Sequence, residues 1–166
     1  MNQNNQRQID MLIYGCDPGF TGAIALYWTD TGKLEVHDMP VMQNPKGKAI
    51  INLHSLLAVL KNEADEKCLA LIEQVSAMKG QGVSSMFRFG EGYGMLQMAC
   101  AANKLPTQFV TPAKWKGCFG LNRDKGVSRG LAMQRFPEYA GLFSRVKDDG
   151  RAEAALIALY AAENMV

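Results

Sequence analysis

Apolar residues in the first forty positions group into three short runs, and this pattern predicts strands. Residues 11–16 (MLIYGC) and 22–28 (GAIALYW) are apolar enough for buried strands, and residues 34–39 (LEVHDM) alternate between apolar and polar. The turn sequences DPGFT and TDTGK lie between them. Because such short connections join antiparallel neighbours, we expect a three-stranded antiparallel meander.

The middle of the chain changes to a helical pattern and then returns to a strand. Within residues 50–66, apolar side chains recur at helical spacing, which predicts a helix. Residues 68–73 (CLALIE) form a continuous apolar run, typical of a buried strand that lies parallel to its predecessor after a helical crossover. Residues 40–49 are expected to form a loop, and the Gly- and Ser-rich residues 74–92 a mobile loop.

Helices dominate the remaining chain. Small and apolar residues over 93–103 predict a helix, and residues 107–111 predict a fifth strand. Pro112 is well placed in the first turn of a further helix. Residues 125–136 and 151–165 predict the last two helices.

The composition fits one α/β domain. A chain of 166 residues with 48% apolar and 20% charged residues has globular proportions. We expect the domain over residues 11–166, behind a flexible polar tail over residues 1–10 that lacks an apolar signal segment. No apolar run reaches the roughly 18 to 20 residues of a membrane helix, so we expect a cytoplasmic protein without membrane contact.

Cysteines and histidines give no sign of a zinc site. The four cysteines form no CxxC pair, and the two histidines, His37 and His54, have no partner at metal-binding spacing. We expect free, mostly buried thiols in a reducing compartment.

The charge is unevenly distributed although the net charge is only +2. Residues 74–135 hold nine Lys or Arg and two acids, whereas the rest of the chain holds nine Lys or Arg and fourteen acids. A basic middle of this kind is typical of a protein that binds a polyanion on one face, although such a skew also arises by accident.

Four carboxylates are candidates for one site. Asp17 and Glu73 each close an apolar strand, so they emerge at the same edge if those strands are neighbours. In the last helix, Asp149 and Glu153 are four apart and share a face, whereas Asp148 points elsewhere. Alternatives stay open: Asp148 and Asp149 as helix caps, Asp17 as a turn residue, and Glu73 as the partner of a lysine.

Such a set favours hard-cation chemistry. Four converging carboxylates without cysteine or histidine suit Mg²⁺, or Mn²⁺ as a substitute. Two ions about 3.5–4 Å apart activate a water and stabilise the leaving oxygen of a phosphodiester. The four carboxylates are therefore suited to metal-dependent hydrolysis of a phosphodiester.

Five segments in fixed order make the chain recognisable: YGCDPGFTGAIAL, LALIEQV, VTPAKWK, LNRDKGVSRGLAMQRFP and DDGRAEAALIALY. Over roughly residues 11–162 they resemble the RuvC-like Holliday junction resolvases, particularly the phage and organellar branch. The resemblance implies a ribonuclease H-like fold, with a five-stranded mixed sheet flanked by helices. It also implies a homodimer that resolves four-way DNA junctions by paired symmetric nicks, with Mg²⁺ and no small-molecule cofactor, in a bacterial cell. Its metal ligands correspond to Asp17, Glu73, Asp149 and Glu153. With this resemblance we expect a two-metal nuclease that leaves 5′-phosphate and 3′-hydroxyl ends, with Glu73 helping to bridge the metals.

The resemblance also implies DNA-contacting residues. Lys116 and Lys125 correspond to basic residues that contact DNA or assist at the scissile phosphate, and Trp115 is expected to be a partly buried anchor. The helix with Met95 and Met98 corresponds to a dimer interface, although core packing explains the same stripe. The expected DNA contacts are Lys79, Arg88, Lys114, Lys116, Lys125 and Arg129.

The chain departs from the bacterial family pattern at two places. Bacterial members space the last two acids three apart, which leaves the choice between Asp148 and Asp149 open. They also carry an aromatic wedge residue just after the second acid, where this chain has Ser76. The substitutes are Met78, Phe87 and Phe89.

Three rival functions were weighed. An ATPase of the actin–hexokinase superfold requires a second domain and a second phosphate loop, for which 166 residues leave no room. A nuclease of the same fold acting on RNA–DNA hybrids or other branched DNA fits the four acids equally well. A non-catalytic DNA-binding protein does not account for four retained acids.

Overall fold

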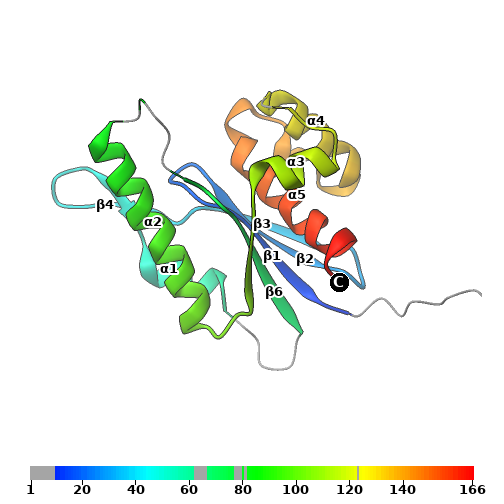
Figure 1. Ribbon diagram of the computed structural model, residues 1–166, viewed down its shortest axis with the longest axis horizontal. Coiled ribbons are helices and arrows are strands. Elements are labelled where there is room, and N and C mark those ends of the chain that lie inside the picture. Colours follow the sequence, from blue (N-terminus) through cyan, green and yellow to red (C-terminus); the bar gives the residue numbers. More distant parts are fainter. Residues whose placement is uncertain (1–9, 62–66, 77–79, 81, 123) are drawn as a thin grey trace, which may run out of the picture.

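The computed structural model describes residues 10–61, 67–76, 80, 82–122 and 124–166. Its main sheet has the order β3-β2-β1-β6-β7 (Figure 1). β1 is antiparallel to β2, and β2 to β3, whereas β1–β6 and β6–β7 are parallel pairs. The strands are β1 (Leu12–Asp17), β2 (Ala23–Trp28), β3 (Leu34–Asp38), β6 (Cys68–Glu73) and β7 (Thr107–Val110).

Helices cover both faces of this sheet. α1 (Leu53–Val59) and α2 (Val83–Ala102) lie on one face (Figure 1). The other face is covered by α3 (Pro112–Cys118), α4 (Lys125–Arg135) and α5 (Asp149–Asn164), together with the short 3-10 helices η1 (Pro137–Phe143) and η2 (Val146–Asp148).

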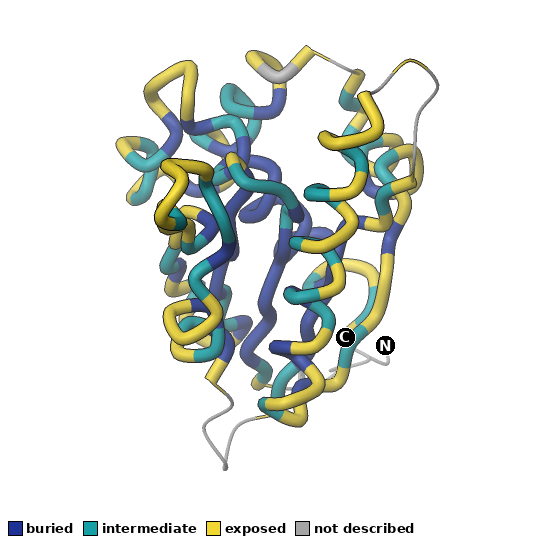
Figure 2. The backbone as a smooth tube through the Cα atoms, turned by 90° about the vertical axis from the view of Figure 1, so that its left-hand side faces the viewer, coloured by how far each residue is buried: buried dark blue, intermediate teal, exposed yellow. Residues whose placement is uncertain are grey.

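The strands are buried between these layers, as the dark blue centre of Figure 2 shows. Alternate residues of β1 face opposite sides, because side chains alternate along a strand. Ile13 packs in the core under α5, whereas Tyr14 and Cys16 pack in the core under α1 and α2. Two separate apolar cores therefore hold the sheet rigidly, and its strand ends form a fixed platform.

α5 lies directly on β1 because Gly15 has no side chain. A Cβ at Gly15 would stand 2.2 Å from the carbonyl oxygen of Ala154 and 2.8 Å from Cβ of Ala158. The helix is rich in alanine on this face, and Ala154, Ala155 and Ala158 are fully buried. This close approach places the first turn of α5 beside the end of β1.

The five predicted strands and the mixed sheet are confirmed within one or two residues at each end. The α4 and α5 helices also begin and end near their predicted limits. The helix predicted over residues 50–66 is shorter, Leu53–Val59, and Asn52 caps its start by accepting from the backbone N–H of Ser55.

Two loop predictions are wrong. The chain expected to be a mobile loop over residues 74–92 is helical from Val83 onward, as part of α2. Its glycines disfavour a helix by about 1 kcal/mol each, but burial of Leu96 and Cys100 against the sheet holds the helix in place. Residues 40–49, also expected to be a loop, contain β4 (Val41–Gln43) and the start of β5 (Ala49–Ile51), a separate two-stranded hairpin.

No helix among the described residues is long and apolar enough to span a bilayer.

Candidate metal centre

Three carboxylates converge at the carboxyl ends of the two central strands. Cys16 pairs with Ile72 in the parallel register, so the residues that follow, Asp17 and Glu73, end neighbouring strands at one edge. With Glu153 of α5 they form a group that could hold a metal ion, the one such group among the described residues. Each carboxylate offers one oxygen atom, and these atoms all lie within 4.8 Å of one another. Glu73 and Glu153 are 7% and 5% exposed, so these charges are held largely out of water.

The turn after β1 and the start of α5 fit together closely. A Cβ at Gly22 would stand 2.0 Å from the carbonyl oxygen of Asp17. A Cβ at Gly150 would stand 2.5 Å from the carbonyl oxygen of Thr21 and 3.1 Å from Oδ2 of Asp17. Both glycines are therefore required by close backbone approach, which brings α5 and Glu153 to Asp17.

α3 contacts two of the three carboxylates through consecutive residues. The indole Nε1 of the fully buried Trp115 donates to Oε1 of Glu73 at 2.9 Å. Lys116 donates from Nζ to Oε1 of Glu153 at 2.7 Å. The start of α3 is fixed by Pro112 in its first turn and by Thr111, whose side chain accepts from the backbone N–H of Lys114.

This contact changes the interpretation of Trp115. Trp115 was expected to be a partly buried anchor, but it is fully buried, and its hydrogen bond to Glu73 was not predicted. A buried carboxylate needs hydrogen-bond donors, and the indole N–H can only donate. The adjacent motif WK is the signal that links both residues to the site.

The predicted fourth acid lies outside the three-carboxylate group. Asp149 is the first residue of α5, and its Oδ1 lies 2.8 Å from Nε of Arg129 on α4. Asp148 points away, as expected from helix geometry: it is 1% exposed and accepts from the Arg145 guanidinium and the Arg145 backbone N–H. The structure thus brings together Asp17, Glu73 and Glu153, and places Asp149 beside a cation at the margin.

Arginines beside two further acids fix the start of α5. The Arg145 guanidinium holds the pKa of Asp148 below its usual range. Arg151 donates from Nε and Nη2 to both oxygens of Asp38 at the end of β3, and this pair lowers the pKa of Asp38. These contacts tie α5 and η2 to the edge of the sheet near Glu153.

A cleft of about 500 Å³ opens over the three carboxylates. Its walls come from the turn after β1, the segment after β6 and the start of α3 and α2. The lining residues are Asp17, Pro18, Gly19, Phe20, Thr21, Gly22, Glu73, Gln74, Val75, Ser76, Phe89, Pro112 and Glu153. Such a concave site with convergent carboxylates is the default place for chemistry in this molecule.

The wedge candidates are placed differently from one another. Phe89 lines the cleft, and one of its ring carbons would lie 3.4 Å from a Cβ at Gly19. Phe87 projects from α2 with 72% exposure. Met78 lies outside the described residues.

The expected DNA-contacting residues differ in their surroundings. Lys116 and Arg129 pair with acids of the site, and Arg88 donates to the carbonyl oxygen of Ala49 and stacks on the Phe20 ring at 4.9 Å. Lys114 is exposed. Lys79 and the side chain of Lys125, the first residue of α4, lie outside the described part.

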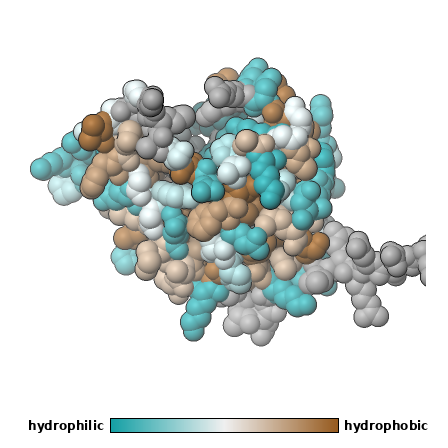
Figure 3. Space-filling view, viewed as in Figure 1, coloured by the Kyte–Doolittle hydropathy of each residue, from teal (hydrophilic) through white to brown (hydrophobic). Residues whose placement is uncertain are grey.

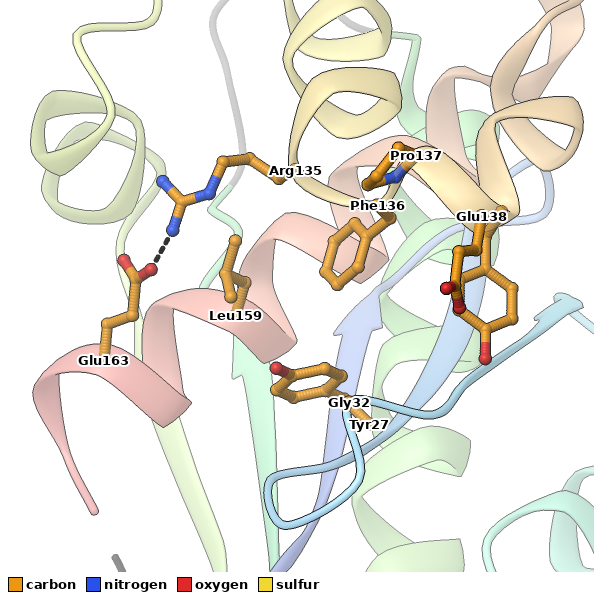
Figure 4. A pocket seen from close by; sticks show the side chains of 9 residues that line it. Tyr27, Gly32, Arg135, Phe136, Pro137, Glu138, Leu159 and Glu163 are labelled. Atoms are coloured by element: carbon orange, nitrogen blue, oxygen red, sulfur yellow. Dashed lines mark hydrogen bonds and ion pairs between the residues drawn. The ribbon is translucent and has the colours of Figure 1, made fainter.

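A second pocket, of about 370 Å³, lies at the far end of α5 (Figure 4). The Tyr27 and Phe136 rings meet edge-to-face there at 5.7 Å, and Arg135 pairs with Glu163 across the rim. Glu163 is ten residues beyond Glu153, about 15 Å along the helix. None of the three converging carboxylates lines this pocket, so the cleft at Asp17 is the better candidate for the active site.

The donor set fits Mg²⁺ or Mn²⁺. Hard divalent cations prefer carboxylate oxygens, and no cysteine or histidine belongs to the group. Cys16 precedes Asp17 but faces the opposite core, where burial raises the pKa of its thiol well above the usual value.

Comparison with solved structures is informative about the fold. The chain is similar to Thermus thermophilus RuvC (TM-score 0.55, 15% identity), covering 92% of this chain and 96% of that one. It is also similar to T. thermophilus RuvC in complex with a Holliday junction substrate (TM-score 0.52, 16% identity), covering 92% and 93%. The chain has a RuvC-like fold. The ribonuclease H-like α/β architecture expected from the sequence is thereby confirmed. No family model and no curated protein matches the chain.

Proposed function

We propose that this RuvC-like chain is a structure-selective DNA endonuclease that resolves four-way junctions by Mg²⁺-dependent phosphodiester hydrolysis. The observation that carries the proposal is the convergence of Asp17, Glu73 and Glu153 within 4.8 Å at the floor of an open cleft. The likeness to RuvC structures, one of them bound to a Holliday junction substrate, supports the choice of a branched DNA substrate.

The protein side chains have separate tasks in this proposal. Asp17, Glu73 and Glu153 hold the metal, and Asp149 completes the set from the margin of the site. When bound, Mg²⁺ supplies the positive charge that stabilises the phosphodiester transition state. Trp115 fixes the orientation of Glu73, and Lys116 neutralises part of the negative charge that would otherwise repel DNA. The products are 5′-phosphate and 3′-hydroxyl ends.

A homodimer follows from the need to cut two strands symmetrically, and α2 offers a self-complementary surface. Its outer side carries an exposed apolar stripe at helical spacing, with large residues toward the ends and glycines in the middle. We define the α2 stripe as Val83, Phe87, Gly90, Gly94, Met98 and Ala101. Gly90 and Gly94 have open space where a Cβ would stand, which leaves room for the backbone of a second α2.

The order of residues in the α2 stripe reads nearly the same in both directions. The midpoint of the stripe is Gly92, with Gly90 and Gly94 on either side of it. Phe87 precedes this midpoint by nearly the same number of residues as Met98 follows it. Two copies crossing there about a two-fold axis would place Phe87 of one opposite Met98 of the other. A two-fold interface requires this kind of self-complementarity. The RuvC-like dimer would then hold its two clefts on the same DNA junction.

The second candidate is a nuclease on RNA–DNA hybrids or other branched DNA, because the three carboxylates fit those substrates equally well. The two candidates are separated by incubating the protein with an immobile four-way junction, a replication fork and an RNA–DNA hybrid, each with and without Mg²⁺. Paired symmetric cuts confined to the junction, with ends that ligase seals, support the proposal. Preferential cleavage of the hybrid, or ends that cannot be ligated, would overturn it. We place the protein in the cytoplasm of a bacterial cell, encoded either by a phage or prophage or by the bacterium.

A further inference from the structure

The β4–β5 hairpin lies outside the main sheet, and packing of the apolar cores does not account for it. β4 and β5 pair with each other, with Met42 opposite Ile50, and form their own two-stranded sheet. Most of the hairpin is exposed, from Val41 to the tip, and only Ile51 at its base is buried. The chain therefore keeps an ordered projection that contributes little to the apolar cores.

The tip is a rigid turn that presents two lysines. The side chain of Asn44 accepts from the backbone N–H groups of Lys46 and Lys48 at 2.9 and 3.0 Å. The backbone of Asn44 also bonds Lys48 and Gly47, and Gly47 adopts the left-handed φ of 71° that this turn requires. Since the backbone groups are satisfied internally, the exposed lysine side chains are what the tip offers to a partner.

The charged residues in the sequence on both sides of the tip are all basic. From residue 39 to residue 62 the sequence contains lysines and one histidine but no aspartate or glutamate. Neither Lys46 nor Lys48 forms an ion pair in the described part of the chain. Hydrophilic side chains gather at the far left of the molecule in Figure 3, where the hairpin lies in Figure 1.

The hairpin is fastened to the wall of the cleft. Arg88 of α2 donates to the carbonyl oxygen of Ala49 on β5 and lies over the ring of Phe20, a cleft residue. At the base, Ile51 and Phe20 both surround Gly92 of α2.

We propose that Lys46 and Lys48 at the hairpin tip bind the phosphate backbone of a DNA duplex arm that leaves the cleft. This inference rests on the proposed function, because it takes DNA as the substrate. Neither lysine is among the DNA-contacting residues expected from the sequence. The contact positions the DNA without reading its sequence, as phosphate contacts do. Arg88 contacts both Ala49 of the hairpin and Phe20 of the cleft, and so holds the hairpin in a fixed position relative to the cleft.

The test measures binding of an immobile four-way junction in Ca²⁺ buffer across a range of monovalent salt. Lys46→Ala/Lys48→Ala is compared with the wild type and with Lys67→Ala, an exposed lysine before β6 at the opposite end of the sheet. Each lost phosphate contact lowers the slope of log K against log salt by about 0.9. We expect a slope reduction of about 1.8 and roughly 10- to 60-fold weaker binding at 0.1 M salt for the double variant, and no change for Lys67→Ala.

An unchanged slope in the double variant, with normal wild-type binding, overturns the inference alone. A loss of binding that accompanies dissociation into monomers in sedimentation also overturns it, since the hairpin would then belong to an interface between copies. If the wild type itself shows no binding to branched DNA, the proposed function fails and this inference fails with it. Equal melting temperatures of wild type and variants show that the exposed substitutions leave the fold intact.

Discussion

The indole N–H of Trp115 donates to Oε1 of Glu73 at 2.9 Å, from a side chain with no exposed surface. In metal sites, partners of this kind orient the ligand, and their loss typically weakens metal binding about 10- to 100-fold. The candidate metal site is therefore expected to depend on Trp115, although this side chain is not itself a metal ligand.

Trp115→Phe keeps most of the apolar volume and removes the donor. We expect Mn²⁺ affinity, measured by titration calorimetry, to fall about 10- to 100-fold. The matched control is Trp28→Phe, because Trp28 lies at the other end of β2 and stacks under Lys33. An equal effect of both substitutions, or no effect of either, would show that the hydrogen bond to Glu73 is irrelevant to metal binding.

Lys116→Met should act in the opposite direction on the same measurement. Nζ of Lys116 lies 2.7 Å from Oε1 of Glu153, so the ammonium group competes with a divalent cation for that carboxylate. Removing it is expected to tighten Mn²⁺ binding roughly tenfold. It should also lower the melting temperature of the metal-free protein, because Glu153 would stay buried beside two other carboxylates without its cation. Lys114→Met, an exposed neighbour, serves as the control. Weaker metal binding in Lys116→Met would refute the competition.

Met98→Glu should separate the two copies of the proposed dimer. In the proposed dimer a carboxylate at position 98 would lie against the apolar Phe87 of the other copy, so it would be desolvated without a partner and would also remove apolar area from the contact. Sedimentation velocity is expected to change from dimer to monomer, whereas Gln134→Glu on the exposed side of α4 leaves the dimer intact. A wild type that sediments as a monomer at micromolar concentration would contradict the assigned interface.

Acid should release the arginine contacts that fix the start of α5. Arg145 and Arg151 lower the pKa of Asp148 and Asp38, so each contact stabilises the fold above the ordinary aspartate pKa of about 3.9. The contribution is lost as pH falls below that value toward the lowered pKa. In urea unfolding, Asp148→Asn should therefore be less stable than the wild type at pH 7, and the difference should shrink below pH 4. A difference that stays constant with pH would rule out the ion pair as its cause.

Much of the fold was predictable because its strands are bounded by turns and their apolar runs are unambiguous. The neighbouring positions of Asp17 and Glu73 also followed, since two strand-ending acids on parallel neighbours must share an edge. Glu153 was found because helical periodicity places it on the face of α5 that packs on the sheet.

What was missed depends on contacts between distant segments. Gly15 and Gly150 look ordinary in the sequence, yet their missing side chains allow α5 to dock on β1 and Thr21. The bond from Trp115 to Glu73 arises only when α3 docks. The first half of α2, before Tyr93, was expected to be a loop because its glycine and serine content outweighed the buried face that the later residues of the helix provide. The ion pair between Arg129 of α4 and Asp149 likewise arises only when the two helices pack together, and the sequence did not predict it.

The central claim is that Asp17, Glu73 and Glu153 hold the metal that cleaves a DNA junction. The most direct measurement is single-turnover cleavage of an immobile four-way junction with and without Mg²⁺, by the wild type and by Asp17→Asn, Glu73→Gln and Glu153→Gln. We predict paired Mg²⁺-dependent nicks by the wild type, and loss of at least about 10³-fold in rate with retained junction binding for each variant. Full nicking activity in Glu73→Gln, or wild-type cleavage that continues after metal removal, would contradict the account.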